Sequence, residues 1–264
     1  MSEAIRLYGA QCGWRCGNAG DECARDIVRW LSGRDVVQTE EVLGSELAAI
    51  GSVAQKLGEF SGYVWGVGLM FDHLRAATPQ AKVVALRGPL TARRWNGLTA
   101  RVPLGDPGLL AADVYAITRP ETPRYRVGLV PHYSDGDLLD VRTWARVFCE
   151  EVTVIDICGR PRDVLEQMAR CEHILSSSLH GLVFADALDI PSNWVVLSDR
   201  VQGGSFKFRD YFAAFGAHDP LPATFHPAAR PSDIVCYPQS KRSRSVADVK
   251  RDLVAAFPFP RTAT

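Results

Sequence analysis

Short apolar runs alternate with amphipathic stretches along most of this chain, and this alternation restricts the possible folds more than any other feature. Over about 21–31, apolar residues recur at positions i, i+3, i+4 and i+7, which predicts a helix with one apolar face. That face consists of Ala24, Ile27, Val28 and Leu31. Strands are expected around this helix at Ile5–Tyr8, Leu47–Ile50, Tyr63–Trp65 and Val83–Leu86.

The stretch Ile117–Tyr125, with the sequence ITRPETPRY, interrupts the alternation. It predicts a linker, because it combines two prolines with several polar residues. The alternation then resumes, with strands expected at Arg126–Val130, Val152–Ile157, His173–Ser176 and Trp194–Leu197. The helices expected between and after them are Leu138–Cys149, Arg162–Cys171 and Leu179–Leu188.

Strands that alternate with helices indicate parallel sheets covered by helices on both faces. The 264 residues are enough for two compact domains, and the linker divides them into units of similar size. We therefore predict an α/β protein with two Rossmann-like domains, residues 1–120 and 121–264, facing each other across a cleft. Ligands of such sheets bind at the carboxyl ends of the strands, so reactive side chains are expected there.

Charge and hydropathy exclude several classes of protein. Lys and Arg together number 30, as do Asp and Glu, whereas a nucleic-acid surface needs clustered positive charge. No apolar run reaches the ~20 residues of a membrane-spanning helix. The N-terminus has no secretion-signal pattern, so we expect a cytoplasmic protein. The basic stretch Ser240–Ser245 is interpreted as solvated surface, with weak contact to anionic lipid as the alternative.

The cysteines are interpreted as reduced cytosolic thiols. Cys12, Cys16 and Cys23 lie close together in the sequence, but their spacing fits no standard zinc site and no nearby histidine completes four ligands. We therefore predict no metal site. The other four cysteines are Cys149, Cys158, Cys171 and Cys236.

The strongest candidate for chemistry is Ser176–Gly181, with the sequence SSSLHG, which joins an apolar strand to a helix. It places His180 in the first turn of that helix, where free backbone N–H groups and the helix dipole attract anions. The serines add hydroxyl donors. A lone histidine in a loop is often structural, but the serines and Gly181 favour a role in phosphate binding and proton transfer.

Arg87 is the second candidate, because it follows an apolar strand and precedes Gly88 and Pro89, where a helix can begin. It is expected to project from the carboxyl edge of the sheet into the cleft. Its planar guanidinium matches a carboxylate or phosphate with two parallel hydrogen bonds. The alternative is a surface arginine in a salt bridge.

Other segments carry weaker signals of function than His180 and Arg87. Gly17–Asp21, with the sequence GNAGD, resembles a phosphate-binding turn but fits neither the dinucleotide fingerprint nor the P-loop, and Asp21 is interpreted as a helix N-cap. Asp106 and His132 lie where strands meet loops, and each alone indicates a turn. Phe206–Phe212, with the sequence FKFRDYF, predicts either a core face with extended cations or a helix that brings Lys207 to the cleft.

Taken together, these segments resemble the polysaccharide pyruvyl transferase family over nearly the whole chain. The resemblance is most specific in SSSLHGLVFADALDIP, which is Ser176–Pro191. Further similar segments are Trp65–Leu69, Ala85–Pro89, Gly105–Leu110, Gly128–Tyr133, Phe206–Phe212 and Ala255–Phe259. The opening segment Cys12–Cys23 is only loosely similar to the asparagine–glycine–aspartate turn of the family. Within the family, the short length and these motifs are most similar to the ketal pyruvyl transferases of xanthan type.

The resemblance implies two Rossmann-like domains arranged as in GT-B glycosyltransferases, with the acceptor on the N-terminal domain and the donor on the C-terminal domain. It implies phosphoenolpyruvate as donor, a lipid-linked oligosaccharide as acceptor, and no cofactor or metal, and it allows peripheral contact with the inner membrane. The family's catalytic histidine and arginine correspond to His180 and Arg87. The donor-binding residues implied are Ser177, Ser178, Leu179, Gly181 and Lys207. Residues expected to line the acceptor side or the cleft are Asn18, Asp21, Asp106 and His132.

The reaction implied forms a pyruvate ketal, with a 4,6 linkage to the terminal sugar. A proton must reach C3 of the enol phosphate, a hydroxyl must attack C2, and phosphate must leave. His180 is expected to be the general acid for C3 and to carry hydroxyl protons. Arg87 is expected to clamp the carboxylate or phosphate, and Lys207 to balance the leaving charge. The alternatives are a nucleotide-sugar-dependent glycosyltransferase of the same fold and a non-catalytic carbohydrate-binding protein.

Overall fold

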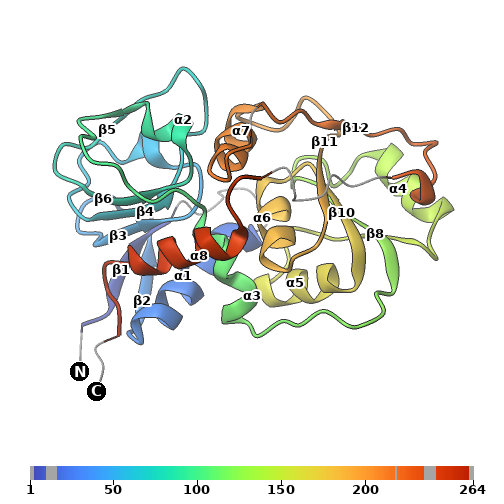
Figure 1. Cartoon of the computed structure of the whole chain (residues 1–264), viewed down its shortest axis with the longest axis horizontal. Coiled ribbons are helices and arrows are strands. Elements are labelled where there is room, and N and C mark those ends of the chain that lie inside the picture. The colour runs from blue at the N-terminus through green and yellow to red at the C-terminus, as the bar shows by residue number, and fades with distance from the viewer. Residues whose placement is uncertain (1–2, 10–16, 218, 235–241, 262–264) are drawn as a thin grey trace.

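The computed structural model describes residues 3–9, 17–217, 219–234 and 242–261, and it contains two five-stranded parallel sheets at opposite ends of the molecule (Figure 1). Both sheets consist of strands linked by helices and crossover loops, as the alternation of the sequence predicts. The α/β class with parallel sheets is therefore confirmed.

The first sheet has the strand order β2-β1-β3-β4-β6. These strands are β1 (Ile5–Tyr8), β2 (Val36–Thr39), β3 (Leu47–Ala49), β4 (Tyr63–Val67) and β6 (Lys82–Leu86). A separate two-stranded sheet pairs β5 (Ala76–Ala77) with β7 (Trp95–Asn96). Near the sheet lie the 3-10 helix η1 (Ala54–Lys56) and the short helix α2 (Pro89–Ala92), which begins at the proline as expected.

Helix α1 (Ala19–Ser32) connects β1 to β2 and illustrates how local sequence sets its ends. Asn18 is extended and accepts a hydrogen bond from Gly20 N, whereas Gly33 ends the helix in the left-handed region. The N-cap is therefore Asn18, and Asp21 lies in the first turn, which corrects the sequence interpretation. The apolar residues Ile27 and Val28 of the predicted face are fully buried.

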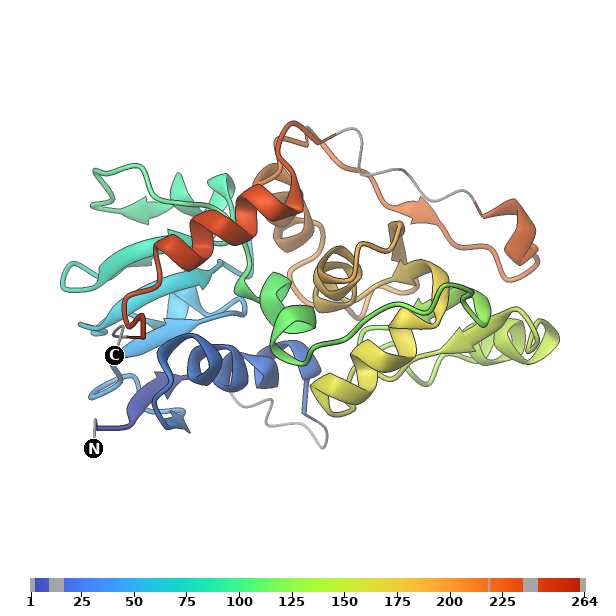
Figure 2. The same cartoon turned by 60° about the horizontal axis from the view of Figure 1, so that its bottom comes forward.

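The second sheet has the strand order β12-β11-β10-β8-β9. These strands are β8 (Tyr125–Val130), β9 (Val152–Val154), β10 (Cys171–Ser176), β11 (Ser192–Val196) and β12 (Ala223–Thr224). The connecting helices are α4 (Leu139–Val147), α5 (Pro161–Ala169) and α6 (Leu179–Ala187). The nine residues Leu179–Ala187 are all buried, which fits a helix that lies between the two sheets (Figure 2).

Short elements join the two halves of the chain. The 3-10 helix η2 (Pro107–Leu110) and α3 (Ala111–Val114) both contact α1 and α6, and α7 (Phe206–Ala213) contacts α2. The remaining elements are η3 (Pro231–Asp233) and α8 (Val246–Ala255). Although α8 follows the second sheet in sequence, it lies beside the first (Figures 1 and 2), where Trp65 Nε1 donates to Leu253 O at 2.9 Å.

Expected and observed elements differ mostly at their ends. The strand expected over 152–157 stops at Val154, because Asp156 Oδ1 accepts a hydrogen bond from Cys158 N at 2.9 Å and turns the chain. Strand β2 was not expected. The linker expected over 117–125 is irregular up to β8, and the division at residue 120 stays a prediction.

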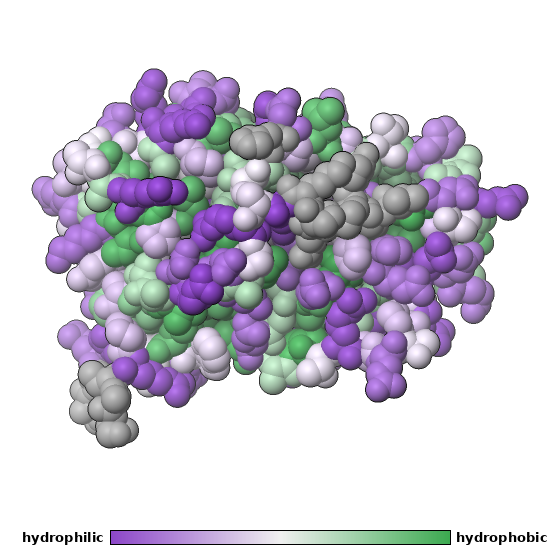
Figure 3. All heavy atoms as spheres, in the orientation of Figure 1, coloured by the Kyte–Doolittle hydropathy of each residue, from purple (hydrophilic) through white to green (hydrophobic). Residues whose placement is uncertain are grey.

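On the face seen in Figure 3, hydrophobic residues are scattered among hydrophilic ones. Over the described part of the chain, none of the helices has the length and hydropathy needed to span a bilayer.

Candidate active site

His180 and Asn18 meet where α1 and α6 begin. The imidazole Nδ1 lies 3.2 Å from Asn18 Oδ1, which also accepts from Gly20 N at 3.0 Å. Gly20 lies directly against the ring, since a Cβ at this position would be 1.9 Å from His180 Cγ. The GNAGD turn and the SSSLHG turn are therefore in contact, although Asn18 and His180 are 162 positions apart in the sequence. His180 occupies the first helical turn, as predicted.

The contact with Asn18 fixes the tautomer of His180. Because Gly20 N already donates to Asn18 Oδ1, that oxygen is an acceptor, and Nδ1 of the ring must carry the proton. Nε2 then holds a lone pair, and it is buried without a partner among the described residues. Burial, followed by the charges of Lys207 and Arg87, lowers the pKa of His180 to about 3. In the resting protein His180 is a neutral proton acceptor.

The three serines before His180 mainly hold the turn. Ser176 Oγ donates to Val130 O at 2.8 Å and accepts from Ser178 N at 3.0 Å. Ser177 Oγ donates to Asp135 Oδ2 at 2.6 Å and accepts from His132 N at 2.9 Å.

The residues on either side of the histidine are also packed. A Cβ on Gly181 would be 2.2 Å from Ser176 Oγ, so only glycine fits there. Leu179 is buried in the core, and Ser178 precedes the helix without capping it through its side chain. The donor contacts expected of Ser177, Ser178, Leu179 and Gly181 stay predictions.

Lys207 carries the other basic group of this region, and its Nζ lies 5.5 Å from the centroid of the Phe208 ring. It lies in the first turn of α7 and is 6% exposed, and its Nζ has no hydrogen bond or ion pair in the described part of the chain. Burial first, and then the charge of Arg87, lowers its pKa to about 8, while Asp21 and Asp135 act in the opposite direction. A buried ammonium without a counter-ion is suited to an anionic ligand.

His132 follows β8 at the carboxyl edge of the second sheet. Its Nδ1 lies 2.7 Å from Ser134 Oγ, and burial, followed by the charge of Lys207, lowers its pKa to about 3. Both histidines are therefore neutral, and both lie within electrostatic reach of Lys207.

Two carboxyl groups face the same region. Asp106 caps η2 by accepting from Gly108 N at 2.9 Å, while its Oδ2 is buried without a partner among the described residues. Burial raises the pKa of Asp106 to about 6. Burial and the nearby Asp106 charge raise the pKa of Asp21 to about 7. The structure thus brings Asp21, Asp106 and Lys207 into one electrostatic neighbourhood, and their role as cleft residues stays a prediction.

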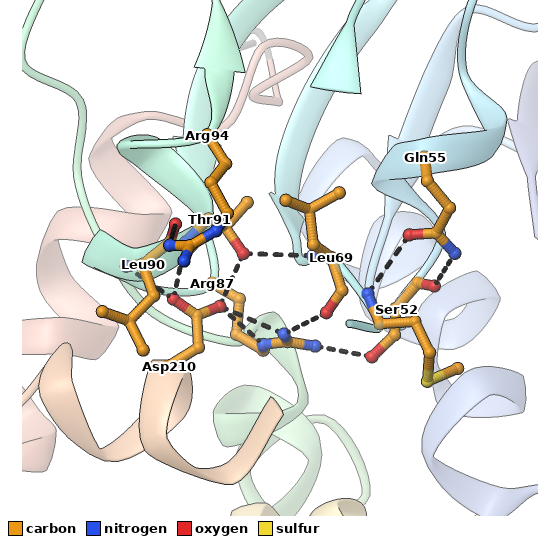
Figure 4. A network of polar contacts seen from close by, with 9 residues as sticks. Ser52, Gln55, Leu69, Arg87, Leu90, Thr91, Arg94 and Asp210 are labelled. Atoms are coloured by element: carbon orange, nitrogen blue, oxygen red, sulfur yellow. Dashed lines mark hydrogen bonds and ion pairs between the residues drawn. The ribbon is translucent and has the colours of Figure 1, made fainter. Parts of the chain in front are cut away.

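Arg87 is completely buried rather than projecting into an open cleft. Figure 4 shows its polar contacts. Its Nε and Nη2 both lie 3.1 Å from Asp210 Oδ2. Nη1 donates to Ser52 Oγ at 2.6 Å, and Nη2 also donates to Leu69 O at 2.7 Å. Every nitrogen of this guanidinium has a partner within the protein. A direct contact between Arg87 and the donor stays a prediction.

Asp210 is a residue that the sequence analysis missed. Its Oδ1 accepts from Leu90 N and Thr91 N, both at 2.9 Å, and its Oδ2 accepts from Thr91 Oγ1 at 2.7 Å. It therefore caps α2 from α7, about 120 positions later in the sequence (Figure 4). Its spacing of three residues from Lys207 was the available signal, because it places both on one side of a helix.

Helix α7 contacts both halves of the molecule. Phe206 packs in the apolar cluster of the first sheet, together with Val67 and Leu86. Phe208 stacks on Trp194 of β11, with ring centroids 4.5 Å apart. Lys207 lies between Phe206 and Phe208 in the sequence, so its position depends on packing against both halves of the molecule.

The turn after β3 is strained. Ile50 has a φ of 62°, which is rare for a β-branched residue, and it is followed by Gly51 with a φ of 86°. Gly51 lies beside Asp21, whose Oδ1 would be 3.0 Å from a Cβ on that glycine. The next residue, Ser52, accepts from Arg87. Such strain concentrates at functional sites, and this turn lies between the Arg87 network and Asp21.

Among the described residues, no group of three or more His, Cys, Asp or Glu side chains is placed to hold a metal ion. Cys23, Cys149 and Cys171 are free thiols, while Cys12, Cys16 and Cys236 lie outside the described residues. A separate cavity of about 1000 Å³ is lined by residues of β11 and by 219–226, and it includes none of the predicted site residues.

Comparison with known proteins identifies relatives of the chain. A family model described as polysaccharide pyruvyl transferase matches residues 65–199, about half of the chain. This range includes Arg87, His132 and His180, whereas Asp21 and Lys207 lie outside it. An uncharacterized protein, L143, of Acanthamoeba polyphaga mimivirus is 36% identical over 121 residues, which are 44% of this chain and 40% of that protein.

A second relative is the succinoglycan biosynthesis protein ExoV of Rhizobium meliloti strain 1021. It is 30% identical over 138 residues, which are 50% of this chain and 40% of ExoV. The matched stretch therefore spans less than half the length of either relative.

Proposed function

The chain belongs to the polysaccharide pyruvyl transferase family, and from this premise we propose that it transfers a pyruvyl group from phosphoenolpyruvate to a sugar of a bacterial exopolysaccharide precursor. Two hydroxyls of the sugar react, a ketal with a 4,6 linkage forms, and phosphate is released. The proposed acceptor is a lipid-linked oligosaccharide, reached from the cytoplasm or from the periphery of the inner membrane.

The observation that carries this proposal is a pair of buried basic groups. Lys207 forms no ion pair among the described residues, and His180 Nε2 has no hydrogen-bond partner there. Phosphoenolpyruvate carries a phosphate and a carboxylate, so it can form an ion pair with the buried Lys207 ammonium, to which Asp21 and Asp135 are nearby carboxyl groups. The free N–H groups at the start of α6 add donors for the same anion.

The roles of the basic residues follow from their surroundings. Lys207 balances the charge of the phosphate as it leaves. His180, neutral and with a lone pair on Nε2, takes the proton from an attacking sugar hydroxyl. Arg87 fixes Asp210 and thereby α7. Burial lowers the pKa values of His180 and Lys207, and the Arg87 charge adds to this effect.

The proposed architecture assigns each sheet to one Rossmann-like domain, as in GT-B glycosyltransferases. The acceptor then contacts the N-terminal domain near Asn18 and Asp21, and the donor contacts the C-terminal domain near His180 and Lys207. Helix α8, which packs on Trp65, belongs with the first domain in this arrangement.

Incubation with phosphoenolpyruvate and a panel of p-nitrophenyl sugars tests this function. Phosphate release and product mass are followed together, and the expected product is heavier than the sugar by one pyruvate ketal. Turnover of a nucleotide sugar, with no phosphate released from phosphoenolpyruvate by any acceptor, would identify a glycosyltransferase instead.

A further inference from the structure

The carboxyl group of Asp21 has no assigned task in the chemistry above. It is partly exposed, and within the described ranges its oxygens form no hydrogen bond or ion pair. Asp21 follows Gly20, which lies against the His180 ring, and belongs to the helical turn that Asn18 caps. An unused carboxyl thus belongs to the residue that directly follows the glycine packed against the His180 ring.

Charged groups from four elements face Asp21. Asp106 comes from the start of η2, Lys207 from α7 and Lys56 from η1, while Glu22 follows on α1 itself. Lys207 is the residue proposed to meet the donor phosphate, so the carboxyl of Asp21 lies within electrostatic reach of the donor. The strained turn at Gly51 also lies close to the Asp21 carboxyl.

Burial shifts the pKa values of Asp21 and His180 in opposite directions. Burial, with a smaller contribution from Asp106, raises the pKa of Asp21 to about 7, whereas burial lowers that of His180 to about 3. Near neutral pH a large fraction of Asp21 is protonated while His180 is neutral. Pairs of titratable groups separated in this way commonly divide the work of acid and base.

Ketal formation needs both kinds of group at once. A proton must be added to C3 of the enol while another leaves the attacking hydroxyl. The only free ring nitrogen of His180 is Nε2, because Nδ1 is bound to Asn18, and an unprotonated Nε2 has no proton to give. A second group must therefore supply the proton for C3.

We propose that Asp21 is this acid, and that it protonates C3 while His180 takes the proton of the attacking hydroxyl; the inference rests on the proposed function. In the first step the Asp21 O–H bond breaks and the π electrons of the enol form the new C3–H bond. The sugar oxygen bonds to C2, and its proton moves to His180 Nε2. Asp21 is left as a carboxylate and His180 as an imidazolium.

The second step restores both groups. The C2–O bond to phosphate breaks, and the phosphate leaves with the electron pair, beside the Lys207 charge, and takes the proton from His180. The second hydroxyl bonds to C2, and its proton returns to the Asp21 carboxylate. Across both steps phosphoenolpyruvate and a diol yield a ketal and phosphate, with no other reactant.

Asp21→Asn tests the assignment, with Glu22→Gln as a matched control that removes a neighbouring, exposed carboxylate from the same helical turn. We expect Asp21→Asn to bind phosphoenolpyruvate at least as tightly as the wild type and to lose about 10²-fold or more in kcat. Asp21→Glu should recover part of that loss, because it restores a carboxyl. Glu22→Gln should retain wild-type kcat.

The pH dependence of kcat separates the two roles. Because Asp21 must be protonated, wild-type kcat should fall as pH rises through about 7, and His180→Gln should be slower but keep this fall. Asp21→Asn should not show the fall of kcat near pH 7. Its kcat should decline only near pH 8, where Lys207 loses its proton. If Asp21→Asn does not fold, the pH profiles of kcat for the wild type and His180→Gln test the assignment instead. If neither profile falls as a group with a pKa near 7 loses its proton, the assignment is overturned.

Failure of this inference differs from failure of the proposed function. Phosphate release by the wild type, together with near-normal kcat in Asp21→Asn, would remove Asp21 from the chemistry and leave pyruvyl transfer intact. No phosphate release by the wild type with any acceptor would contradict the transfer itself.

Discussion

Asp210 and Lys207 lie one turn apart on α7, and both are near Arg87, yet their polar partners differ. Asp210 belongs to a paired cluster, made of Ser52, Arg87, Thr91 and Asp210, in which the buried charges are matched. Lys207 belongs to an open cluster, made of Asp21, Asp106, His180 and Lys207, in which Asp106 Oδ2 and His180 Nε2 are buried without a hydrogen-bond partner among the described residues.

The difference indicates separate tasks for the two clusters. A buried polar group without a partner costs free energy, so a folded protein retains one where a ligand completes it. The paired cluster needs nothing from outside and fixes α7 onto α2. The open cluster has a buried ammonium and a free imidazole nitrogen, which an anionic substrate would satisfy.

The largest expected effect comes from breaking the paired cluster. Asp210→Ala leaves Arg87 buried without its counter-charge and removes the cap of α2, so the free energy of unfolding should fall by about 3–5 kcal/mol. Urea titration measures this. Asp113→Ala is the control, because its ion pair with Lys250 is exposed and should contribute little. Equal stability of the two variants would show that the paired cluster is not a structural anchor.

The next effect falls on activity rather than on folding. His180→Gln can still donate a hydrogen bond to Asn18, so its melting temperature should stay close to that of the wild type. It lacks the proton-accepting nitrogen, and kcat should fall roughly 10²-fold or more. Steady-state kinetics with saturating donor and acceptor checks this. Near-normal kcat would make His180 a positioning residue, and His132 would be the next candidate.

A smaller effect should follow from shifting His180 without replacing it. In Gly20→Ala the new Cβ overlaps the imidazole, which must move, and displacements of this size cost roughly 10-fold or more in rate. Gly58→Ala is the matched control, because nothing lies within 4 Å of its Cβ. If both variants have wild-type kcat, the close contact between α1 and the ring has no catalytic consequence.

The sequence predicted most of the fold, because hydrophobic periodicity depends on neighbouring residues. It missed β2, where Val36–Thr39 is only four residues long and has no clear alternation of buried and exposed positions. It also misplaced the cap of α1. Asn18 and Asp21 both suit that position, and the choice follows from the backbone at Asn18, which is extended.

The site could be predicted only where its signals are local. The strand-to-helix turn placed His180 correctly. Arg87 was expected in the cleft because nothing near it in sequence announces Asp210, which lies 123 positions away. The pairing of Asn18 with His180 is equally remote. Contacts between the two halves depend on how the sheets pack, and no short motif encodes that packing.

The central claim is that the open cluster binds the anionic donor, and titration calorimetry with phosphoenolpyruvate tests it most directly. Wild type should bind saturably, and Lys207→Met should bind at least roughly 10-fold more weakly, because a charge-assisted contact is lost. Lys82→Met, which removes an exposed lysine, should bind like the wild type. Equal affinity of Lys207→Met and wild type, or wild-type binding of nucleotide sugars but not phosphoenolpyruvate, would contradict the account.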